Sequence, residues 1–398
     1  MSSTAAPGPS PAELRARAVA MQPALAERVT EADRLRRVPD ATIAAFRDAG
    51  FFRMLQPARW GGFEVDPQVF FDVQATVGAA CASSAWVLGV LGVHAWQLAL
   101  FPLEAQEEVW GEDTGTLISS SYAPTGKVAR EPGGYLLSGR WSFSSGCDHA
   151  QWAFLGGMVP PPAGEAGPPE MRTFLVPRKD WRIEDNWHVM GLKGTGSKDV
   201  VVDGCFIPEH RTHKLIDGYK RSSPGNEINK APLYRLPFGQ VFVRSVSTTA
   251  IGIAQGALDA YRKNTASRIA ASDGAKVALD PSAQIVASRA HGVIEDLRGQ
   301  IHRNFDEMMA QVRAGEELPL ERRLKFRVDS SMAVVRSAEV VDALFTESGG
   351  RAIFDGSALQ RAFLDVHAAR AHYANNPEKP ARNLGGVLLG QKNTDYFV

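Results

Sequence analysis

The spacing of hydrophobic positions changes twice along the chain and divides it into three parts. From residue 11 to about residue 103 the pattern is mainly helical, and Ile43 and Phe46, three residues apart, share one helix face. The stretch 78–103 is apolar on nearly every side, which predicts a buried helix or helix pair. Long helical patterns return from about residue 238 to residue 375.

The middle part has a different pattern. Short β-branched and aromatic runs alternate with Gly, Pro and Asp, which predicts a small antiparallel β-domain. The predicted strands cover residues 117–122, 135–143, 152–159, 173–176 and 200–207. The Pro- and Gly-rich segment 160–170 is predicted to be the loop of a hairpin.

This order of elements predicts a mostly helical fold with a central β-domain. The predicted units are an N-terminal helical domain (1–114), a β-domain (115–214) and a C-terminal helical bundle with a substrate loop (215–398). Within the last two units, segment 211–237 is expected to form a variable loop over a pocket.

Composition excludes several classes of function. The chain has 44 basic and 44 acidic residues, so no charge excess favours nucleic acid or an anionic membrane surface. The most apolar stretch, 85–93, is shorter than the roughly 20 residues that span a bilayer. Three widely spaced cysteines and a beginning unlike a signal peptide favour a reducing compartment. We therefore expect a cytoplasmic protein that binds neither nucleic acid nor a membrane.

Few motifs indicate a particular chemistry. The chain contains neither GxGxxG at the start of a βαβ unit nor GxxxxGK[ST], so no nicotinamide site is predicted. No histidine pair has metal-binding spacing, and no metal is expected. Two Ser-rich segments, 118–126 and 141–149, place hydroxyls beside aromatic residues, which suits the edge and face of a planar polar ring. Solvent-facing serines on ordinary strands are the alternative. His94, in an apolar helix, is either a core residue or the polar contact of a pocket.

These motifs, in this order, resemble the flavin-dependent monooxygenases of acyl-CoA dehydrogenase fold, often called group D. Within that family the chain is most similar to hydroxylases of phenol rings in steroid catabolites and hydroxyphenylacetate. The resemblance covers nearly the whole chain. Besides the Ser-rich strands it includes FFRMLQPARWGG (51–62), GLKGTGSKDVVVDGCFIP (191–208) and DVHAARAHYANNP (365–377).

The resemblance implies roles for individual positions. Ser144 would lie near flavin N5, and His372 would act as a base near flavin C4a. Further cofactor contacts would come from Trp141, Ser145, Thr195, Gly196, Ser197, Arg268, Gly349 and Gly350. The last three correspond to places where a neighbouring subunit meets the cofactor's phosphates. Substrate contacts would come from His94, Ser119, Ser120 and Ser121. Arg235 is a candidate to steer an acidic substrate, with a surface position as the alternative.

One departure from the dehydrogenase pattern bears on the reaction. Many acyl-CoA dehydrogenases carry a catalytic Glu in this C-terminal region, whereas here Asp365 is followed by His367 and His372 with no acid before Glu378. A histidine with an ordinary pKa of about 6.5 takes a phenolic proton at neutral pH, which favours hydroxylation. An acyl-CoA dehydrogenase, an N- or S-oxygenating member of the same group, and a flavin-binding scaffold with a degenerate site remain alternatives.

The resemblance also implies partners. Reduced FAD or reduced FMN would come from a separate NAD(P)H-dependent flavin reductase, because the chain shows no nicotinamide site. Oxygen would then form a C4a-hydroperoxyflavin that hydroxylates a small phenolic, indolic or polycyclic aromatic substrate. In this fold the cofactor lies between protomers, so a homotetramer built from two dimers is expected.

Overall fold

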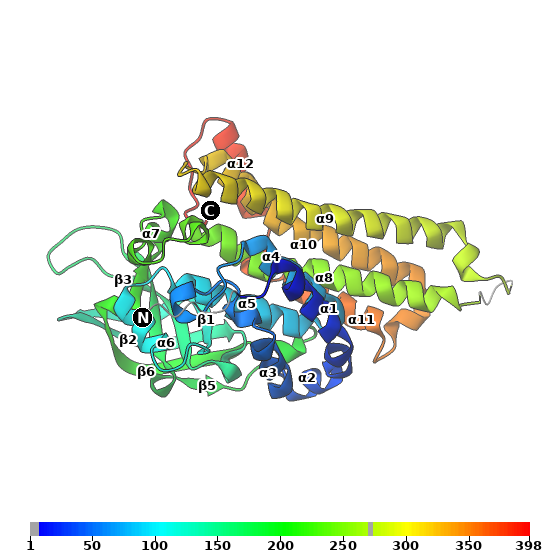
Figure 1. Ribbon diagram of the computed structural model, residues 1–398, viewed down its shortest axis with the longest axis horizontal. Coiled ribbons are helices and arrows are strands. Elements are labelled where there is room, and N and C mark those ends of the chain that lie inside the picture. The colour runs from blue at the N-terminus through cyan, green and yellow to red at the C-terminus, as the bar shows by residue number, and fades with distance from the viewer. Residues whose placement is uncertain (1–7, 270–273) are drawn as a thin grey trace.

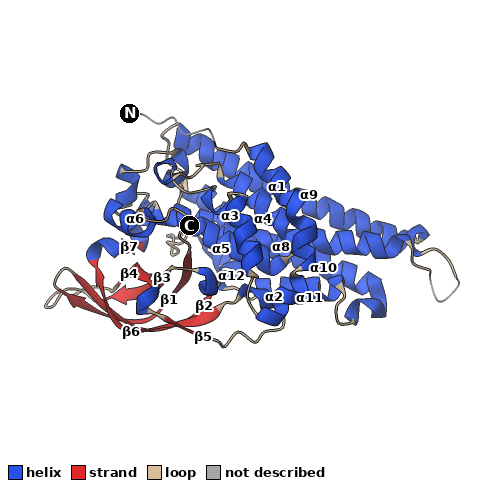
Figure 2. Ribbon diagram, turned by 60° about the horizontal axis from the view of Figure 1, so that its bottom comes forward, coloured by secondary structure: helices blue, strands red, loops and turns tan. Residues whose placement is uncertain are grey.

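The computed structural model describes residues 8–269 and 274–398, and its three parts follow one another along the chain (Figure 1). The strands gather at one end of the molecule, and the helices fill the rest (Figure 2). The three long helices of the C-terminal part run side by side away from the sheet. This separation agrees with the predicted order of helical domain, β-domain and helical bundle.

The N-terminal part is helical. Its helices are α1 (Pro11–Glu27), α2 (Val29–Leu35), α3 (Asp40–Asp48), α4 (Pro67–Ala80), α5 (Ala82–Leu98) and α6 (Leu103–Trp110). Ser10 and Glu13 form a reciprocal capping box that starts α1. The apolar stretch predicted as one helix or a pair is a pair, because the backbone of Cys81 is extended and separates α4 from α5. Helix α5 is buried on nearly every side, as its composition predicts.

The middle part is one seven-stranded sheet in the order β5-β6-β2-β1-β3-β4-β7. Its strands are β1 (Ile118–Glu131), β2 (Gly134–Ser144), β3 (Trp152–Val159), β4 (Glu170–Pro177), β5 (Arg182–Glu184), β6 (Lys198–Pro208) and β7 (Thr212–Lys214). The expected antiparallel domain needs one correction, because β1 and β3 pair in parallel. Strand β1 is long and changes partner, pairing first with β3 and then with β2. Strands β5 and β7 were not predicted, because strands of three residues are too short to show an alternating pattern in the sequence.

The C-terminal part is a bundle around one central helix. Its helices are α7 (Leu215–Lys220), α8 (Phe238–Ala266), α9 (Pro281–Arg313), α10 (Leu320–Ser348), α11 (Ala358–Arg370) and α12 (Glu378–Leu388). Helix α8 packs against α4, α5, α10 and α11 and so joins the N-terminal and C-terminal helices. A Cβ at Gly252 would lie 2.6 Å from the Ala75 carbonyl oxygen, which explains the close approach of α8 to α4. By length and composition α8 would cross a membrane, but 89% of its most apolar window is buried within the protein.

Candidate active site

A bulge in β2 places the serines of the second Ser-rich segment. The pairing of β2 with β6 shifts between Trp141 and Ser144, and Phe143 between them has a φ of 65°. Such backbone costs a non-Gly residue on the order of 1–3 kcal/mol, and bulges of this kind re-aim side chains next to active sites. The Ser144 side chain is fully buried, whereas the Phe143 side chain is 68% exposed.

Ser144 lies where β1 and β2 separate. The two strands pair through their backbones from Lys127 onward, and side chains join them before that point. Ser144 Oγ donates to Ser119 Oγ at 3.1 Å, and Ser121 Oγ donates to the Ser142 carbonyl at 2.7 Å. The predicted cofactor contact Ser144 is therefore held by a predicted substrate contact, Ser119.

Three further hydroxyls, those of Ser145, Ser197 and Thr195, form a continuous row beside the bulge. Ser145 Oγ lies 2.7 Å from Ser197 Oγ, which lies 2.7 Å from Thr195 Oγ1. Thr195 donates to the Leu192 carbonyl at 2.9 Å, so its own oxygen must accept from Ser197. Ser197 in turn accepts from Ser145, which accepts the Trp86 Nε1–H at 3.0 Å. The direction of every proton in this hydroxyl row is thereby set.

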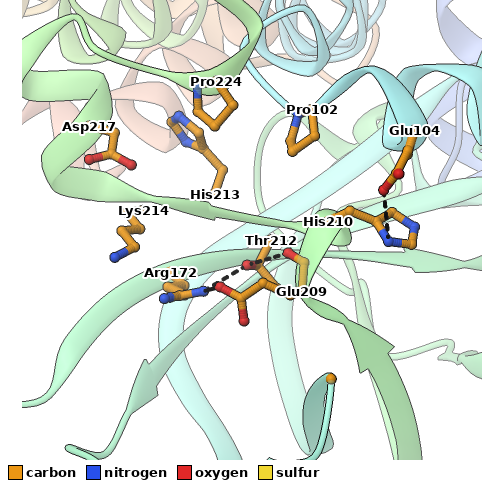
Figure 3. A pocket seen from close by; sticks show the side chains of 11 residues that line it. Pro102, Glu104, Arg172, Glu209, His210, Thr212, His213, Lys214, Asp217 and Pro224 are labelled. Atoms are coloured by element: carbon orange, nitrogen blue, oxygen red, sulfur yellow. Dashed lines mark hydrogen bonds and ion pairs between the residues drawn. The ribbon is translucent and has the colours of Figure 1, made fainter.

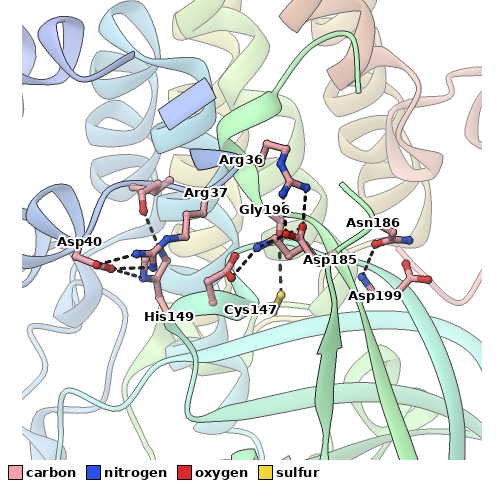
Figure 4. Close-up of polar contacts among 12 residues, drawn as sticks. Arg36, Arg37, Asp40, Cys147, His149, Asp185, Asn186, Gly196 and Asp199 are labelled. Carbon is pink, nitrogen blue, oxygen red and sulfur yellow. Dashed lines mark hydrogen bonds and ion pairs between the residues drawn. The ribbon is translucent and has the colours of Figure 1, made fainter. Parts of the chain in front are cut away.

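Ion pairs join the segments beside the hydroxyl row to one another and to the end of α2 (Figure 4). Arg36, at the end of α2, forms a two-pronged pair with Asp185 at 2.6 and 2.7 Å. Lys198 donates to Asp148 Oδ1 at 2.8 Å. Gly196 has a φ of 55°, and a Cβ there would lie 2.6 Å from Asp148 Oδ2. The position therefore favours glycine, and Gly196 serves the shape of the loop.

His372 lies in the turn between α11 and α12, at the Trp86 end of the hydroxyl row. Its ring meets the Trp86 ring edge to face, with centroids 5.5 Å apart. Its Nδ1 accepts the backbone N–H of Ala374 at 3.1 Å, so the proton of the neutral imidazole is on Nε2. Burial, followed by the positive charge of Arg327, lowers the pKa of His372 to about 4 and keeps the ring neutral at pH 7.

This arrangement differs from the role expected for His372. With Nδ1 engaged and Nε2 protonated, the ring offers a proton to its surroundings and has no free lone pair. The role of His372 as a base near flavin C4a stays a prediction, and in this tautomer it requires the bond between Nδ1 and the Ala374 N–H to open.

His94, in the last turns of α5, provides such a lone pair. Its Nδ1 donates to the Ile118 carbonyl at 2.5 Å, and the side chain is fully buried. Within the described residues its Nε2 has no hydrogen-bond partner. Burial lowers the pKa of this imidazole to about 4, so Nε2 is an acceptor at pH 7. A buried acceptor without a partner costs about 1–3 kcal/mol, which a donor on a ligand would offset.

Aromatic side chains form walls around His94 that the sequence analysis did not identify. Phe154 meets the His94 ring edge to face at 5.5 Å, and Tyr122 does so at 6.3 Å. Tyr122 also meets Phe238 at 5.8 Å and Phe242 at 5.0 Å. The four-residue spacing of Phe238 and Phe242 was an available signal, because it puts both rings on one face of α8. Such walls suit a planar aromatic ligand.

Alternation along β1 separates the three serines predicted to contact substrate. Ser119 and Ser121 bond to β2, as described above. Ser120 lies on the opposite face with Tyr122, whose hydroxyl donates to Gln97 Oε1. Ser120 is therefore the one of the three that shares a face with the aromatic walls of His94.

Arg235 lies in a short turn, Pro232–Arg235, that leads into α8. It is half-buried, and its Nη2 donates to the Asn226 carbonyl at 3.1 Å. In the described part of the chain, no carboxylate lies within ion-pair distance of it. Trp96 Nε1 donates to the Leu233 carbonyl at 2.9 Å and so ties this turn to α5. Segment 211–237 is thus more ordered than the loop expected from the sequence.

The predicted phosphate contacts come together at the far end of α8, where Arg268 lines a pocket of about 360 Å³ and the two glycines lie in the adjoining turn. Arg268 Nη1 donates to the Ser348 carbonyl at 3.1 Å, next to Gly349, whose φ is 62°. Gly350 follows in the same turn. The cations that line the pocket are Lys263, Arg268 and Arg351. Clustered guanidinium and ammonium groups suit phosphate oxygens.

Trp141 belongs to the core of the β-domain, and its predicted contact with the cofactor stays a prediction. Its side chain is fully buried, and its Nε1 donates to the Gly156 carbonyl at 2.8 Å. A Cβ at Gly126 would lie 2.2 Å from the Trp141 ring, so the ring is enclosed on that side too. The aromatic residue that the bulge exposes beside the serines is Phe143.

A larger pocket, of about 470 Å³, opens behind the aromatic walls (Figure 3). His213 of β7 borders it and packs on Phe101 at 5.3 Å, which stacks on Phe154. The buried cation of this pocket, Arg172, is already paired with Glu209. His213 therefore supports Phe101 and Phe154 from the side of this pocket, and the charge of Arg172 is balanced by Glu209.

The groups around Ser144 fit a flavin. The serine and threonine oxygens offer acceptors to the N–H groups of a planar ring, Phe143 offers an aromatic face, and the Arg268 pocket suits phosphates. No group of three His, Cys, Asp or Glu residues in the described segments is arranged to hold a metal ion.

Comparisons with known proteins agree with this reading of the site. Residues 13–114 match the family model of the acyl-CoA dehydrogenase N-terminal domain, and residues 245–377 match that of the C-terminal domain. The flavin-dependent monooxygenase oxygenase subunit HsaA of Rhodococcus jostii (strain RHA1) is 42% identical over 380 residues, which cover 95% of this chain and 99% of that protein. The chain belongs to the family of flavin-dependent monooxygenase oxygenase components.

A solved structure and another relative support the assignment. The crystal structure of 3-HSA hydroxylase from Rhodococcus sp. RHA1 superposes with a TM-score of 0.92 and 42% identity, covering 97% of this chain and 99% of that one. The FADH2-dependent resorcinol hydroxylase, oxygenase component, of Rhizobium sp. (strain MTP-10005) is 34% identical and covers 90% of both chains. The predicted fold and the predicted flavin-dependent monooxygenase are confirmed, and the acyl-CoA dehydrogenase alternative does not hold.

Proposed function

We propose that this oxygenase component hydroxylates a small phenolic substrate with oxygen and a reduced flavin that a separate NAD(P)H-dependent reductase delivers. The observation that carries the proposal is the Nε2 of His94, a buried acceptor that is enclosed by aromatic rings and has no hydrogen-bond partner among the described residues. A phenol fits both features, because its planar ring matches the aromatic walls and its O–H group can donate to Nε2. The relative that hydroxylates resorcinol, itself a phenol, supports the same substrate class.

In this proposal His94 accepts the phenolic O–H hydrogen bond at Nε2. Its Nδ1 stays bonded to the Ile118 carbonyl, which fixes the ring and its tautomer. Drawing the phenolic proton toward Nε2 makes the ring carbon ortho to the oxygen more nucleophilic. Ser120, on the same face as Tyr122, orients the substrate oxygen from the other side. His372, as a donor, faces the reaction from the C-terminal turn.

Reduced flavin supplies the oxygen-activating chemistry when it is bound. Ser144 donates its own proton to Ser119, so its oxygen is left to accept an N–H from the cofactor. Gly196 shapes the loop that carries Thr195 and Ser197. FAD is favoured over FMN because the cationic Arg268 pocket suits a second phosphate, and because the resorcinol hydroxylase is named as FADH2-dependent. Buried walls around Ser144 and His94 exclude water.

A shared cofactor site between protomers, and hence a homotetramer of paired dimers, is also part of the proposal. The His372 turn is fastened to α8 at Val246, because Asn375 Nδ2 donates to that carbonyl at 3.1 Å. The Arg268 pocket begins 17 residues further, at Lys263, or about 26 Å at the rise of 1.5 Å per residue. Bringing these two places to one flavin calls for a second protomer. The exposed Leu389 side chain supports such contacts.

A cytoplasmic location completes the proposal. It is supported by Cys81, Cys147 and Cys205, which are all free thiols, as a reducing compartment favours. Cell fractionation followed by immunodetection tests it, and recovery of the protein outside the cytoplasmic fraction would contradict it.

The decisive experiment combines the purified chain, a flavin reductase, NAD(P)H, FAD and isotope-labelled oxygen with a panel of phenols. Phenol-dependent oxygen uptake with one labelled atom in the ring product is expected. Aryl methyl ethers of the same phenols serve as matched controls, because they keep the ring and lack the O–H donor. Equal turnover of phenols and ethers would contradict the role of His94, and turnover of amines or thioethers alone would favour N- or S-oxygenation.

A further inference from the structure

Asp365 is a buried carboxylate that the proposed reaction does not use. It lies on α11, and its side chain is 7% exposed. Among the described residues its side chain has one hydrogen-bond partner, the Leu192 N–H, which donates to Oδ1 at 2.6 Å. Arg361, on the same helix, is paired with Asp33 at 3.4 Å, and within the described segments Asp365 has no salt bridge. A carboxylate buried in this way costs stability, which indicates a role other than stabilising the fold.

The bond to Asp365 holds an unusual piece of backbone. Leu192 has a φ of 53°, a left-handed conformation that residues with branched or bulky side chains rarely adopt. Gly191, just before it, presses on α11, where a Cβ would lie 2.1 Å from the Leu364 carbonyl oxygen. Gly194, two residues after Leu192, donates its N–H to Ser83 Oγ at 3.1 Å. The loop thus takes its path from contacts with two other parts of the molecule.

The carbonyl of Leu192 is also the end of the hydroxyl row. It accepts the Thr195 hydroxyl at 2.9 Å and the Thr195 N–H at 3.1 Å. Because each hydroxyl donates to the next, this one acceptor sets the direction of the whole row. At its other end the row receives the Trp86 N–H, and the Trp86 ring contacts His372. Asp365 is therefore connected to both the flavin-facing hydroxyls and the His372 ring.

We propose that Asp365 is a positioning residue of the oxygenase reaction, which holds the Leu192 backbone and thereby orders the hydroxyl row beside the flavin site. The inference rests on the proposed function, because it takes this row as a surface that faces the flavin. Without the acceptor on Asp365 the Leu192 carbonyl shifts and the hydroxyls and Trp86 adopt several orientations. More of the consumed oxygen then leaves as hydrogen peroxide, and less reaches the substrate.

Two substitutions of Asp365 test this in the full chain, with reductase, FAD and a phenol that the wild type hydroxylates. The measured quantity is coupling, the amount of hydroxylated product per oxygen consumed. Asp365→Asn keeps an oxygen that accepts the Leu192 N–H, so coupling near the wild-type value is expected. Asp365→Ala removes the acceptor and is expected to lower coupling about fivefold, with the KM for phenol unchanged. Asp365→Leu fills the space without an acceptor and replaces the Ala variant if that variant does not fold.

The matched control is Asp342→Ala. Asp342 accepts from His367 Nε2 at 2.9 Å and so joins α10 to α11 without touching Leu192. This control is expected to couple like the wild type. Thr195→Val, which removes the last hydroxyl of the row, is expected to uncouple as strongly as Asp365→Ala, and Thr195→Ser to restore coupling.

Wild-type coupling in the Ala or Leu variant would overturn the proposal, as would an Asn variant that uncouples as strongly as Ala. Failure of the proposed function is recognised separately, because the wild type itself would then give no hydroxylated phenol. In that case the affinity for reduced FAD, measured by anaerobic titration, decides. It is expected to fall about fivefold for Asp365→Ala and to be kept by Asp365→Asn. Equal affinities of the two variants would overturn the positioning role.

Discussion

Replacing Asp365 by Asn is expected to stabilise the protein at neutral and alkaline pH and to have little effect in acid. Burial is the main reason that the pKa of this carboxyl rises to about 7, and the negative charge of Asp33 raises it further. The Leu192 N–H, Arg361 and Lys193 oppose this rise. In the unfolded chain the pKa of an aspartate is about 4. Between these two values the folded protein keeps a proton that the unfolded chain releases.

The sign of the effect follows from this difference. The contribution of Asp365 to the free energy of unfolding is fully present below about pH 4 and is lost as the pH rises through about 7. Three pH units at about 1.4 kcal/mol each give about 4 kcal/mol at most. Asn has no charge at any pH, so the variant should gain up to this amount over the wild type between pH 4 and pH 8.

Urea unfolding of both proteins at one protein concentration, from about pH 5 to pH 8, measures the difference in the free energy of unfolding. Taking the difference removes all other titrating groups, which the two proteins share. Asp342→Asn, at a half-exposed position on α10, serves as the control and should show no comparable pH trend. A difference between Asp365→Asn and the wild type that stays constant with pH, or that shrinks as the pH rises, would refute the reasoning.

Four other outcomes are expected. His94→Phe should lower kcat/KM for phenols about tenfold or more, since it removes a buried acceptor, and should have no effect of this size on the oxidation of bound reduced flavin. The pH–rate profile should show no ionisation of His94 or His372 between pH 6 and pH 8, because their pKa values are about 4; a histidine titration near pH 6.5 would contradict this. Gly191→Ala should lower the melting temperature and the affinity for flavin together, because its Cβ would lie 2.1 Å from a carbonyl oxygen of α11. Trp141→Phe should cost about 1 kcal/mol of stability and leave coupling unchanged, since its lost hydrogen bond lies in the core of the β-domain.

The sequence by itself determined the elements and their order. Helix and strand periods, caps and turn residues act over a few positions, so the helix of Ile43 and Phe46, the strands of the middle part and the loop 160–170 could be predicted. The parallel pairing of β1 with β3 could not, because strand pairing depends on segments that are far apart in the chain. The family could also be predicted, because the motifs and their order along the chain are properties of the sequence.

Only the tertiary structure decided what each side chain of the site can do. The resemblance implied a substrate contact at His94 and a base at His372, but the hydrogen bonds of their Nδ1 atoms to Ile118 and Ala374 determine the tautomer of each ring. In the same way, only the bulge in β2 decides that Ser144 is buried and Phe143 exposed. The physical reason is that protonation, burial and direction depend on partners from other elements, and those partners meet only when the chain has folded.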